Sequence, residues 1–348
     1  MKVVFLAASG SIVKWAYTDV INCKDIEYCD YPYDFKKGIK KYIFTRTAAD
    51  YTPFFAKRLL YKKYLGYNFF RELKSSDEVL FVFTCQYNMF FDTFFPCFIR
   101  FLKKLYPNSK YAFYYNDLIE TCYPECIDTI KKEFDLVLTF DKNDAKKYGL
   151  TYYGEVYSKN EIGDYEDIAP FDVFFVGSDR NRFDTILKLF KKISDLNFKA
   201  IFYLFDILPE NQNRISEYLP DADIQGDSIT YKKSVMFKNI YCPYQKTLSL
   251  INNCRCILEI TLSAQNAATL RLLEATVYGK KLITNCRDAE NKPYFDKNNI
   301  LFFNDPDNFA AEDYLAFMKT PAKKIEYDFS PLKMIDYIKE ELFREGIQ

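Results

Sequence analysis

Short apolar runs of strand length alternate with helix-like stretches along this chain, and the alternation occurs twice. The expected strands are 2–8, 78–84, 110–115 and 135–140 in the first series, and 171–176, 199–205, 256–260, 281–285 and 299–303 in the second. Strands that alternate with helices are typical of parallel sheets with helices on both faces. The pattern therefore predicts an α/β protein with two Rossmann-like, doubly wound domains that face a cleft.

A charged segment, 159–170, separates the two series. It contains Gly163 and ends at Pro170, which is typical of a linker. We expect an N-terminal domain at 1–160 and a second domain at 171–330. Residues 331–348 have one apolar face and form a terminal helix that can cross back to the first domain.

The composition removes several classes of function. The chain has 348 residues and no histidine, which excludes Ser-His-Asp, Cys-His and histidine-ligated metal chemistry. Lysine plus arginine equals aspartate plus glutamate, so the formal net charge is zero. A nucleic-acid-binding protein should show a basic excess, and no nucleic-acid partner is expected. Cys122 and Cys126 form a CxxxC pair without a second pair at zinc-like spacing, so we expect no metal.

The N-terminal apolar run is too short for a signal peptide, and polar residues break the apolar region 79–101. The sequence therefore predicts a cytoplasmic protein. Basic and aromatic residues interleave at 54–71 and again at 98–106. Such a face can lie on anionic lipid headgroups, which predicts a peripheral contact with the cytoplasmic face of the inner membrane. The alternative is an amphipathic helix packed on its own sheet, with a solvated basic side.

Residues 254–286 combine a strand, a polar loop, a helix and a further strand. The loop contains Ser263, Gln265, Asn266 and Ala268, and the helix begins near Thr269. A helix N-terminus after a buried strand attracts anions, because its free N–H groups and the positive end of the helix dipole point at the ligand. Arg271 and Glu274 lie three positions apart, so they either pair with each other or contact a ligand. An ordinary βαβ unit with a solvated Glu274 is the alternative.

A second polar turn follows the first strand of the second series. It contains Gly177, Ser178, Arg180, Asn181 and Arg182. Arginine favours bidentate contacts with phosphate, which makes this turn a candidate anion site. The motif GxGxxG is absent, so a nicotinamide-binding fold is disfavoured. The alternative is a helix N-terminus with solvated arginines.

Polar residues also end two strands of the first series. Ser9, Gly10 and Ser11 follow the strand 2–8, and Asn116 with Asp117 follows the strand 110–115. Open α/β sheets bind ligands at the carboxyl ends of their strands. The first domain is therefore expected to carry its own ligand edge.

The run LRLLEATVYGKKLIT resembles the signature E-A-x-x-x-G-x-P-V-I near the donor site of GT-B glycosyltransferases. Glu274 matches the second of two glutamates found in many retaining members. Asn266 stands at the position of the first, and Lys281 replaces the proline. The two-domain layout, the glycine after the first strand of the second domain and the terminal helix are shared. Among these enzymes, the sequence resembles bacterial glycosyltransferases of lipopolysaccharide and capsule assembly.

The resemblance implies a hexosyltransferase-type glycosyltransferase without a metal or other cofactor. It would move a sugar from a nucleoside-diphosphate sugar to a saccharide or lipid-linked acceptor. Glu274 would contact the ribose of the donor, and residues 265–269 at the helix end would bind the diphosphate. The turn 177–182 and Arg271 complete the donor side, while residues 9–11 and Asn116 lie on the acceptor side.

The sequence is compatible with either inversion or retention of configuration at the anomeric carbon of the sugar. An inverting enzyme needs a carboxylate base in the first domain, and Asp92, Asp117 and Asp141 are the candidates. A retaining enzyme can do without one. Two other functions are compatible with the fold: a nucleotide-sugar epimerase, which the absence of histidine weakens, and a non-catalytic saccharide-binding protein.

Overall fold

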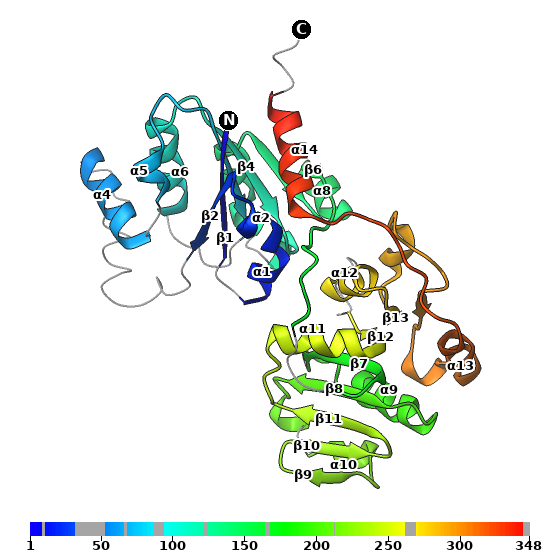
Figure 1. Cartoon of the computed structure of the whole chain (residues 1–348). Coiled ribbons are helices and arrows are strands. Elements are labelled where there is room, and N and C mark those ends of the chain that lie inside the picture. Colours follow the sequence, from blue (N-terminus) through cyan, green and yellow to red (C-terminus); the bar gives the residue numbers. More distant parts are fainter. Residues whose placement is uncertain are drawn as a thin grey trace. The chain divides into compact units, whose positions relative to one another are not determined.

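The computed structural model describes residues 1–8, 11–31, 53–65, 68–85, 94–121, 124–163, 168–211, 213–261 and 269–343. The chain divides into two compact units, Met1–Asn160 with Asp328–Gln348 and Glu161–Tyr327 (Figure 1). The first division falls inside the charged segment 159–170, and the second lies just before the terminal helix. Each unit contains one sheet flanked by helices. The predicted fold class, α/β with two Rossmann-like domains, is confirmed.

The sheet of the first unit is parallel, with the strand order β2-β1-β3-β4-β5-β6. Its strands are β1 (Lys2–Ala8), β2 (Ile26–Tyr31), β3 (Val79–Thr84), β4 (Lys110–Tyr115), β5 (Leu136–Thr139) and β6 (Thr151–Tyr152). Every residue of β3 is buried, as expected of a central strand covered on both faces.

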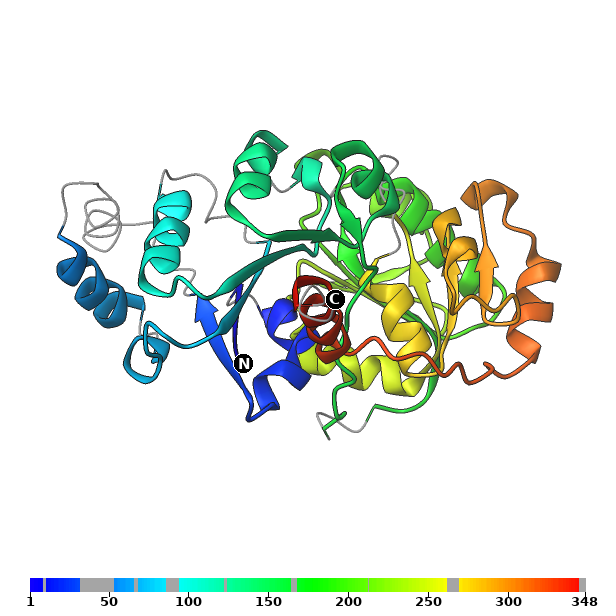
Figure 2. The same cartoon turned by 90° about the horizontal axis from the view of Figure 1, so that it is seen from above.

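Helices cover both faces of this sheet (Figure 2). The helices of this unit are α1 (Ser11–Ala16), α2 (Thr18–Asn22), α4 (Phe54–Leu65), α5 (Phe69–Glu72), α6 (Phe94–Leu105), α7 (Ile127–Glu133), α8 (Lys142–Tyr148) and α14 (Pro331–Phe343), of which α4 lies away from the sheet (Figure 1). The sequence pattern predicts that 119–133 is mostly helical, and the structure has two 3₁₀ turns there, Ile119–Thr121 and Pro124–Cys126, before α7. Pro124 lacks an N–H donor, and its ring obstructs the preceding turn of an α-helix.

The terminal helix α14 packs within the first unit. Its apolar face buries Met334, Ile335 and Ile338. The chain just before it is also fixed there, because Tyr157 donates its N–H to the carbonyl of Phe329 at 2.8 Å. Residues 328–343 therefore complete the first unit rather than the second.

The sheet of the second unit has the order β14-β13-β12-β7-β8-β11-β10-β9. Its strands are β7 (Phe171–Ser178), β8 (Ala200–Phe205), β9 (Asp223–Gln225), β10 (Ser228–Tyr231), β11 (Ser234–Lys238), β12 (Cys254–Glu259), β13 (Lys281–Thr284) and β14 (Ile300–Phe302). Its helices are α9 (Phe183–Asp195), α10 (Ile215–Tyr218), α11 (Tyr244–Asn253), α12 (Leu270–Val277) and α13 (Ala311–Lys319). β10 pairs antiparallel with β9 and β11, an extension that the sequence pattern did not predict.

Both sheets reverse their winding direction beside their first strand. In the first unit β2 and β3 lie on opposite sides of β1, and in the second unit β8 and β12 lie on opposite sides of β7. Ligands of open α/β sheets bind outside the carboxyl ends of the strands at this reversal. The topology therefore places one candidate ligand edge at β1/β3 and another at β7/β12.

Candidate functional site

The carboxyl ends of β7 and β12 lie side by side in the second unit. The two strands are parallel, with Val173 opposite Cys256 and Phe174 opposite Ile257. Helix α9 begins shortly after β7, and α12 is the next helix after β12. The edge thus brings together the turn 177–182, the end of β12 and the first turn of α12, which are separate in the sequence.

The turn between β7 and α9 has an unusual backbone. The N–H of Arg182 donates to the carbonyl of Asp179 at 2.7 Å, and the two residues between them have positive φ angles, 36° for Arg180 and 64° for Asn181. Asparagine tolerates this region well, whereas arginine seldom adopts it. The turn leaves the Arg180 side chain exposed at the sheet edge.

Arg182 ties the two strand ends together. Its Nη2 donates to the carbonyl of Ser178 at 2.7 Å, and its Nη1 donates to the carbonyl of Ile260 beyond β12. Burial lowers the pKa of the guanidinium, with a contribution from the neighbouring charge of Arg180. Arg182 is therefore not a solvated arginine, and its guanidinium is engaged by the backbone of this chain.

Gly177 lies directly under this arginine. A Cβ atom at this position would stand 2.9 Å from Cζ of Phe175 and 3.3 Å from Nη2 of Arg182. The first distance is shorter than any relaxed contact, and the Phe175 ring belongs to the packed core. The strand end therefore needs a residue without a side chain.

We expect Gly177→Ala to lower the free energy of unfolding by about 1–3 kcal/mol, because overpacking forces neighbouring side chains to move. Gly163→Ala is the matched control, since a Cβ atom there would meet nothing within 4 Å. The control should change stability by less than about 0.5 kcal/mol. Urea denaturation of both variants measures the difference, and equal stabilities would contradict the packing argument.

Asp179 is a fully buried acid in the same turn. Its Oδ2 accepts from the backbone N–H of Leu208 at 3.0 Å and from Nδ2 of Asn211 at 2.8 Å. Within the described part of the chain, its Oδ1 and the Nε of Arg182 have no hydrogen-bond partner. Unsatisfied buried polar atoms are few in native proteins, and a bound water or ion can satisfy them.

Glu259 ends β12 and is 2% exposed. Its Oε1 accepts the backbone N–H of Thr269 at 3.1 Å and also the hydroxyl of Thr269, while its Oε2 accepts the hydroxyl of Thr284 at 2.5 Å. Burial raises the pKa of Glu259, and these hydrogen bonds oppose the rise. The carboxylate therefore joins β12, β13 and the start of α12.

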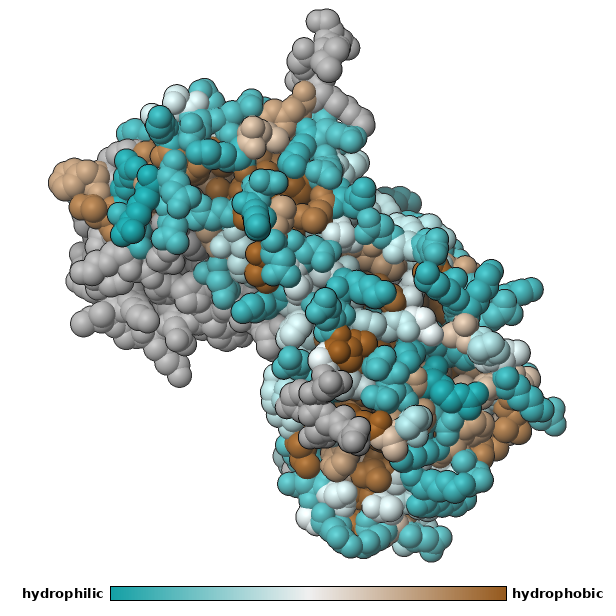
Figure 3. All heavy atoms as spheres, viewed as in Figure 1, coloured by the Kyte–Doolittle hydropathy of each residue, from teal (hydrophilic) through white to brown (hydrophobic). Residues whose placement is uncertain are grey.

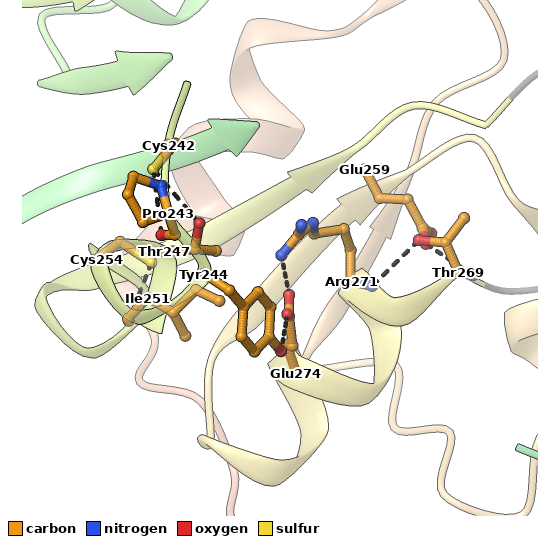
Figure 4. A network of polar contacts seen from close by, with 10 residues as sticks. All are labelled: Cys242, Pro243, Tyr244, Thr247, Ile251, Cys254, Glu259, Thr269, Arg271 and Glu274. Atoms are coloured by element: carbon orange, nitrogen blue, oxygen red, sulfur yellow. Dashed lines mark hydrogen bonds and ion pairs between the residues drawn. The ribbon is translucent and has the colours of Figure 1, made fainter. Parts of the chain in front are cut away.

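Glu274 is also fully buried, and a cation accompanies it (Figure 4). Its Oε1 accepts the hydroxyl of Tyr244 at 2.6 Å, and its Oε2 pairs with Nη1 of Arg271. Burial raises the pKa of Glu274, whereas Arg271 and Tyr244 lower it. The structure thus contains the ion pair that the sequence spacing allowed. The alternative of a solvated Glu274 is wrong, because both of its oxygens are bonded inside the protein.

Several residues predicted from the sequence lie outside the described residues: Ser9, Gly10, Asp92, Ser263, Gln265, Asn266 and Ala268. Thr269 is the N-cap of α12, where its hydroxyl accepts the N–H of Arg271 at 3.1 Å. Ser178, Arg180, Arg182, Thr269 and Arg271 all belong to the β7/β12 edge or to the first turns of its helices.

The remaining predicted residues belong to the first unit. Ser11 is the first residue of α1, and Asn116 and Asp117 follow β4. Asp117 accepts the N–H of its neighbour Leu118 at 2.8 Å. Asp141 caps α8 by accepting the N–H of Asp144 at 2.8 Å, as its place before a short helix predicts. The structure therefore gives Asp141 a structural role as the N-cap of α8.

Four residues of the edge were not singled out from the sequence: Asp179, Tyr244, Glu259 and Thr284. The sequence did contain a signal for Glu259, because it directly follows the apolar run 256–258, and a charged residue buried there needs a partner. The other three become visible only through contacts between residues distant in the sequence.

No group of three or more Cys, Asp or Glu side chains within the described residues is arranged to hold a metal ion. None of the helices in the described ranges is both long and apolar enough to cross a membrane.

Comparison with solved structures identifies the architecture. The Anabaena protein HepE, solved with UDP and glucose, matches with a TM-score of 0.56 at 10% identity, over 98% of this chain and 99% of that one. The chain has the GT-B fold. A glycosyltransferase from Rickettsia africae matches with a TM-score of 0.56 at 13% identity, over 98% and 99% of the two chains. A candidate UDP-N-acetylglucosamine 2-epimerase from Listeria monocytogenes matches with a TM-score of 0.54 at 8% identity, over 99% and 98%.

No protein-family model and no curated protein matches the sequence. At identities this low the structural likeness establishes the GT-B fold alone, and function has to be argued from the site.

Proposed function

We propose that this protein is a hexosyltransferase-type glycosyltransferase that uses a nucleoside-diphosphate sugar without a metal. Its acceptor would be a saccharide or lipid-linked saccharide of surface polysaccharide, such as lipopolysaccharide or capsule. The proposal rests on one observation above all: the reversal point of the second sheet carries two helix N-termini and the exposed Arg180 at one edge. The second unit would bind the donor, and the first unit would bind the acceptor.

Transfer of the sugar requires that the leaving diphosphate be stabilised. As the bond between the anomeric carbon and the phosphate oxygen breaks, negative charge grows on the diphosphate. The positive end of the α12 helix dipole and the Arg180 and Arg271 side chains can offset that charge. The acceptor oxygen forms the new bond and loses its proton to a carboxylate base or to the leaving phosphate. The two routes correspond to inversion and retention, and both stay open.

Glu274 has a less direct part in this proposal than the family signature implies. A contact with the donor ribose requires Glu274 to give up its bond to Tyr244 or to Arg271, since each carboxylate oxygen is already occupied. In this structure, Glu274 instead pairs with Arg271 near the start of α12. The ribose contact remains a prediction that the Glu274→Gln variant can test through its affinity for a nucleoside without phosphates.

A nucleotide-sugar epimerase is the second candidate function, and the likeness to the Listeria protein supports it. The absence of histidine from the whole sequence counts against it, because such enzymes are expected to use histidine near the diphosphate. A non-catalytic saccharide-binding protein is the third. Epimerisation, transfer or simple binding of the same donor would separate the three functions.

The first experiment is a thermal-shift screen with UDP-, GDP-, dTDP- and CMP-sugars. A ligand that binds only the native state, present at 100 times its Kd, stabilises the protein by about 2.7 kcal/mol and should raise the melting temperature by several degrees. The best donor is then incubated with saccharide acceptors, and products are identified by mass spectrometry. If none of the four donor classes shifts the melting temperature or is consumed, the proposal is wrong.

We also propose that the first unit touches anionic lipid through α4, on the cytoplasmic face of the inner membrane. Phe55 is 69% exposed and Leu59 is 62% exposed, and their spacing of four residues places them on one helix face. The helix contains four basic residues and no acidic one. Arg58 donates to the carbonyl of Phe70 at 2.7 Å, which holds α4 against α5. In Figure 3 apolar surface is visible at the end of the first unit that carries α4.

We expect the chain to float with anionic vesicles at low salt, and the double variant Phe55→Ser/Leu59→Ser to bind them at least about tenfold more weakly, because each buried apolar side chain contributes roughly 1.5–3 kcal/mol. Leu315→Ser, at an exposed leucine of α13, is the matched control and should bind like the wild type. Equal binding by the wild type and the double variant, or no binding by either, would exclude this contact.

A further inference from the structure

Glu259 occupies a position where a charged residue is costly. It ends β12, in which every residue except Arg255 is buried, and its side chain is shielded from solvent. Burying a carboxylate is unfavourable unless hydrogen bonds satisfy it, and an apolar side chain at such a position is often more stabilising. A residue that contributed only to stability would not need to be an acid here. The three hydrogen bonds of Glu259 indicate what the acid does.

The donors to Glu259 form a short chain that ends at the first turn of α12 (Figure 4). Arg271 donates its backbone N–H to the hydroxyl of Thr269, and that hydroxyl in turn donates to Oε1 of Glu259. The backbone N–H of Thr269 donates to the same oxygen at 3.1 Å. One carboxylate oxygen therefore fixes both the backbone and the side chain of the N-cap residue.

Glu259 and Thr269 are ten positions apart in the sequence. Their bonds join the last residue of β12 to the residue that precedes α12, so the start of the helix is fastened to the end of the strand. Thr284 anchors the other carboxylate oxygen to β13, the neighbouring strand of the sheet.

We propose that Glu259 is a positioning residue for nucleoside-diphosphate binding: its carboxylate fastens Thr269 and thereby holds the N-terminus of α12 in place for the phosphates. The inference rests on the proposed function of the β7/β12 edge. Glu259 itself does not touch the substrate, because its carboxylate oxygens are occupied by Thr269 and Thr284.

The arrangement needs the ionised form of Glu259, since all three groups that face its oxygens donate hydrogens. Two titratable groups interact with it: Arg271 on α12, which favours the charged form, and Cys286 after β13. Burial, aided by Glu259, raises the pKa of the Cys286 thiol to about 12, so this thiol stays neutral. Burial also raises the pKa of Glu259 itself. Acidification through that pKa protonates the carboxylate of Glu259. The protonated oxygen can no longer accept the hydrogen bond from Thr269 or Thr284, so phosphate binding should weaken as the pH falls.

The test measures affinities for UDP, GDP, dTDP and ADP, and for the parent nucleosides, by titration calorimetry. Thr269→Val removes the hydroxyl at nearly constant volume, whereas Thr269→Ser keeps it. We expect Thr269→Val to bind the diphosphate about tenfold more weakly, which corresponds to the loss of one charge-assisted hydrogen bond. Thr269→Ser should bind like the wild type. Neither variant should change the affinity for the nucleoside.

Glu259→Gln provides the second arm. It keeps the shape of the side chain but cannot be ionised. The wild-type affinity for the diphosphate should fall on acidification from pH 7 to pH 5, and the affinity of Glu259→Gln should be weaker at pH 7 and change less with pH. Circular dichroism at each pH verifies that the variants are folded.

The outcomes separate this inference from the function on which it rests. A wild-type chain that binds none of the four diphosphates overturns both the donor site and the role of Glu259. A wild-type chain that binds one of them, with Thr269→Val and Glu259→Gln equal to it in affinity and pH dependence, overturns only the positioning role. A loss of nucleoside affinity equal to the loss of diphosphate affinity would also overturn it, because it would indicate general damage to the fold.

Discussion

Replacing Arg271 by alanine should lower the free energy of unfolding by about 3–5 kcal/mol at pH 8, because it leaves the Glu274 carboxylate buried without its cation. Glu274 is 0% exposed, and Arg271 is 16% exposed. The hydroxyl of Tyr244 alone cannot compensate for a buried charge. The measurement is urea denaturation of the wild type and the variant, with the slope checked for unchanged cooperativity.

The matched control is Arg287→Ala. Arg287 and Glu290 have the same spacing of three residues as Arg271 and Glu274, but their side chains are 52% and 47% exposed. Exposed pairs contribute about 0–1 kcal/mol, so the control should lose little stability. If Arg271→Ala costs no more than Arg287→Ala, the pair is not buried in the native protein, and Glu274 is free to contact a ligand.

The stability loss in Arg271→Ala should also depend on pH. Burial already raises the folded-state pKa of Glu274 above its ordinary value of 4.5, and Arg271 opposes that rise. Without Arg271 the folded-state pKa rises further, so between pH 4.5 and that pKa the folded state binds more protons than the unfolded state. Stability then falls as the pH rises through this window. The variant should therefore be closer to the wild type at pH 5 than at pH 8.

The sequence predicts the fold well because local signals determine it. Apolar runs such as 79–84 and 171–176 can be buried only as central strands, and their alternation with helices admits few topologies. The β9–β10 extension was not predicted, because the local apolar signal is missing there. Its residues 223–225 are all exposed, so the segment carries no apolar periodicity that could indicate a strand.

The candidate site was only partly predictable. Gly177 and Thr269 stand at positions that any strand-turn-helix pattern marks, whereas the environment of Glu274 depends on Tyr244, which is 30 positions away. A family signature indicates that Glu274 matters but not that its oxygens are occupied. The partners of Glu259 belong to two further elements, and no pattern along one strand could indicate them.

The two arginines of the turn 177–182 also show that the residue type alone does not determine what a side chain does. Both looked equally suited to phosphate in the sequence. In the structure, Arg180 is exposed, whereas the guanidinium of Arg182 binds the carbonyls of Ser178 and Ile260. Arg180 is therefore the candidate for direct contact with an anion, and Arg182 is the candidate for holding the strand ends together.

Arg182→Gln should lower the free energy of unfolding by about 2–4 kcal/mol, because it leaves the two carbonyls without their donors and each unsatisfied group costs about 1–3 kcal/mol. Arg180→Gln is the matched control in the same turn. It should leave stability within about 0.5 kcal/mol of the wild type, since an exposed side chain is shortened and no internal bond is lost.

The two variants should also differ in how their affinity for the nucleotide depends on salt. Arg180→Gln should weaken the binding of the nucleoside diphosphate found in the donor screen by roughly tenfold at low salt, and the difference from the wild type should shrink as salt rises, because an exposed charge acts through a screened field. Arg182→Gln, measured where it is still folded, should lose affinity with little dependence on salt, because the defect lies in the geometry of the strand ends. Equal stabilities for the two variants would mean that Arg182 does not hold β7 to β12. A salt-dependent loss confined to Arg182→Gln would make Arg182, rather than Arg180, the residue that meets the phosphates.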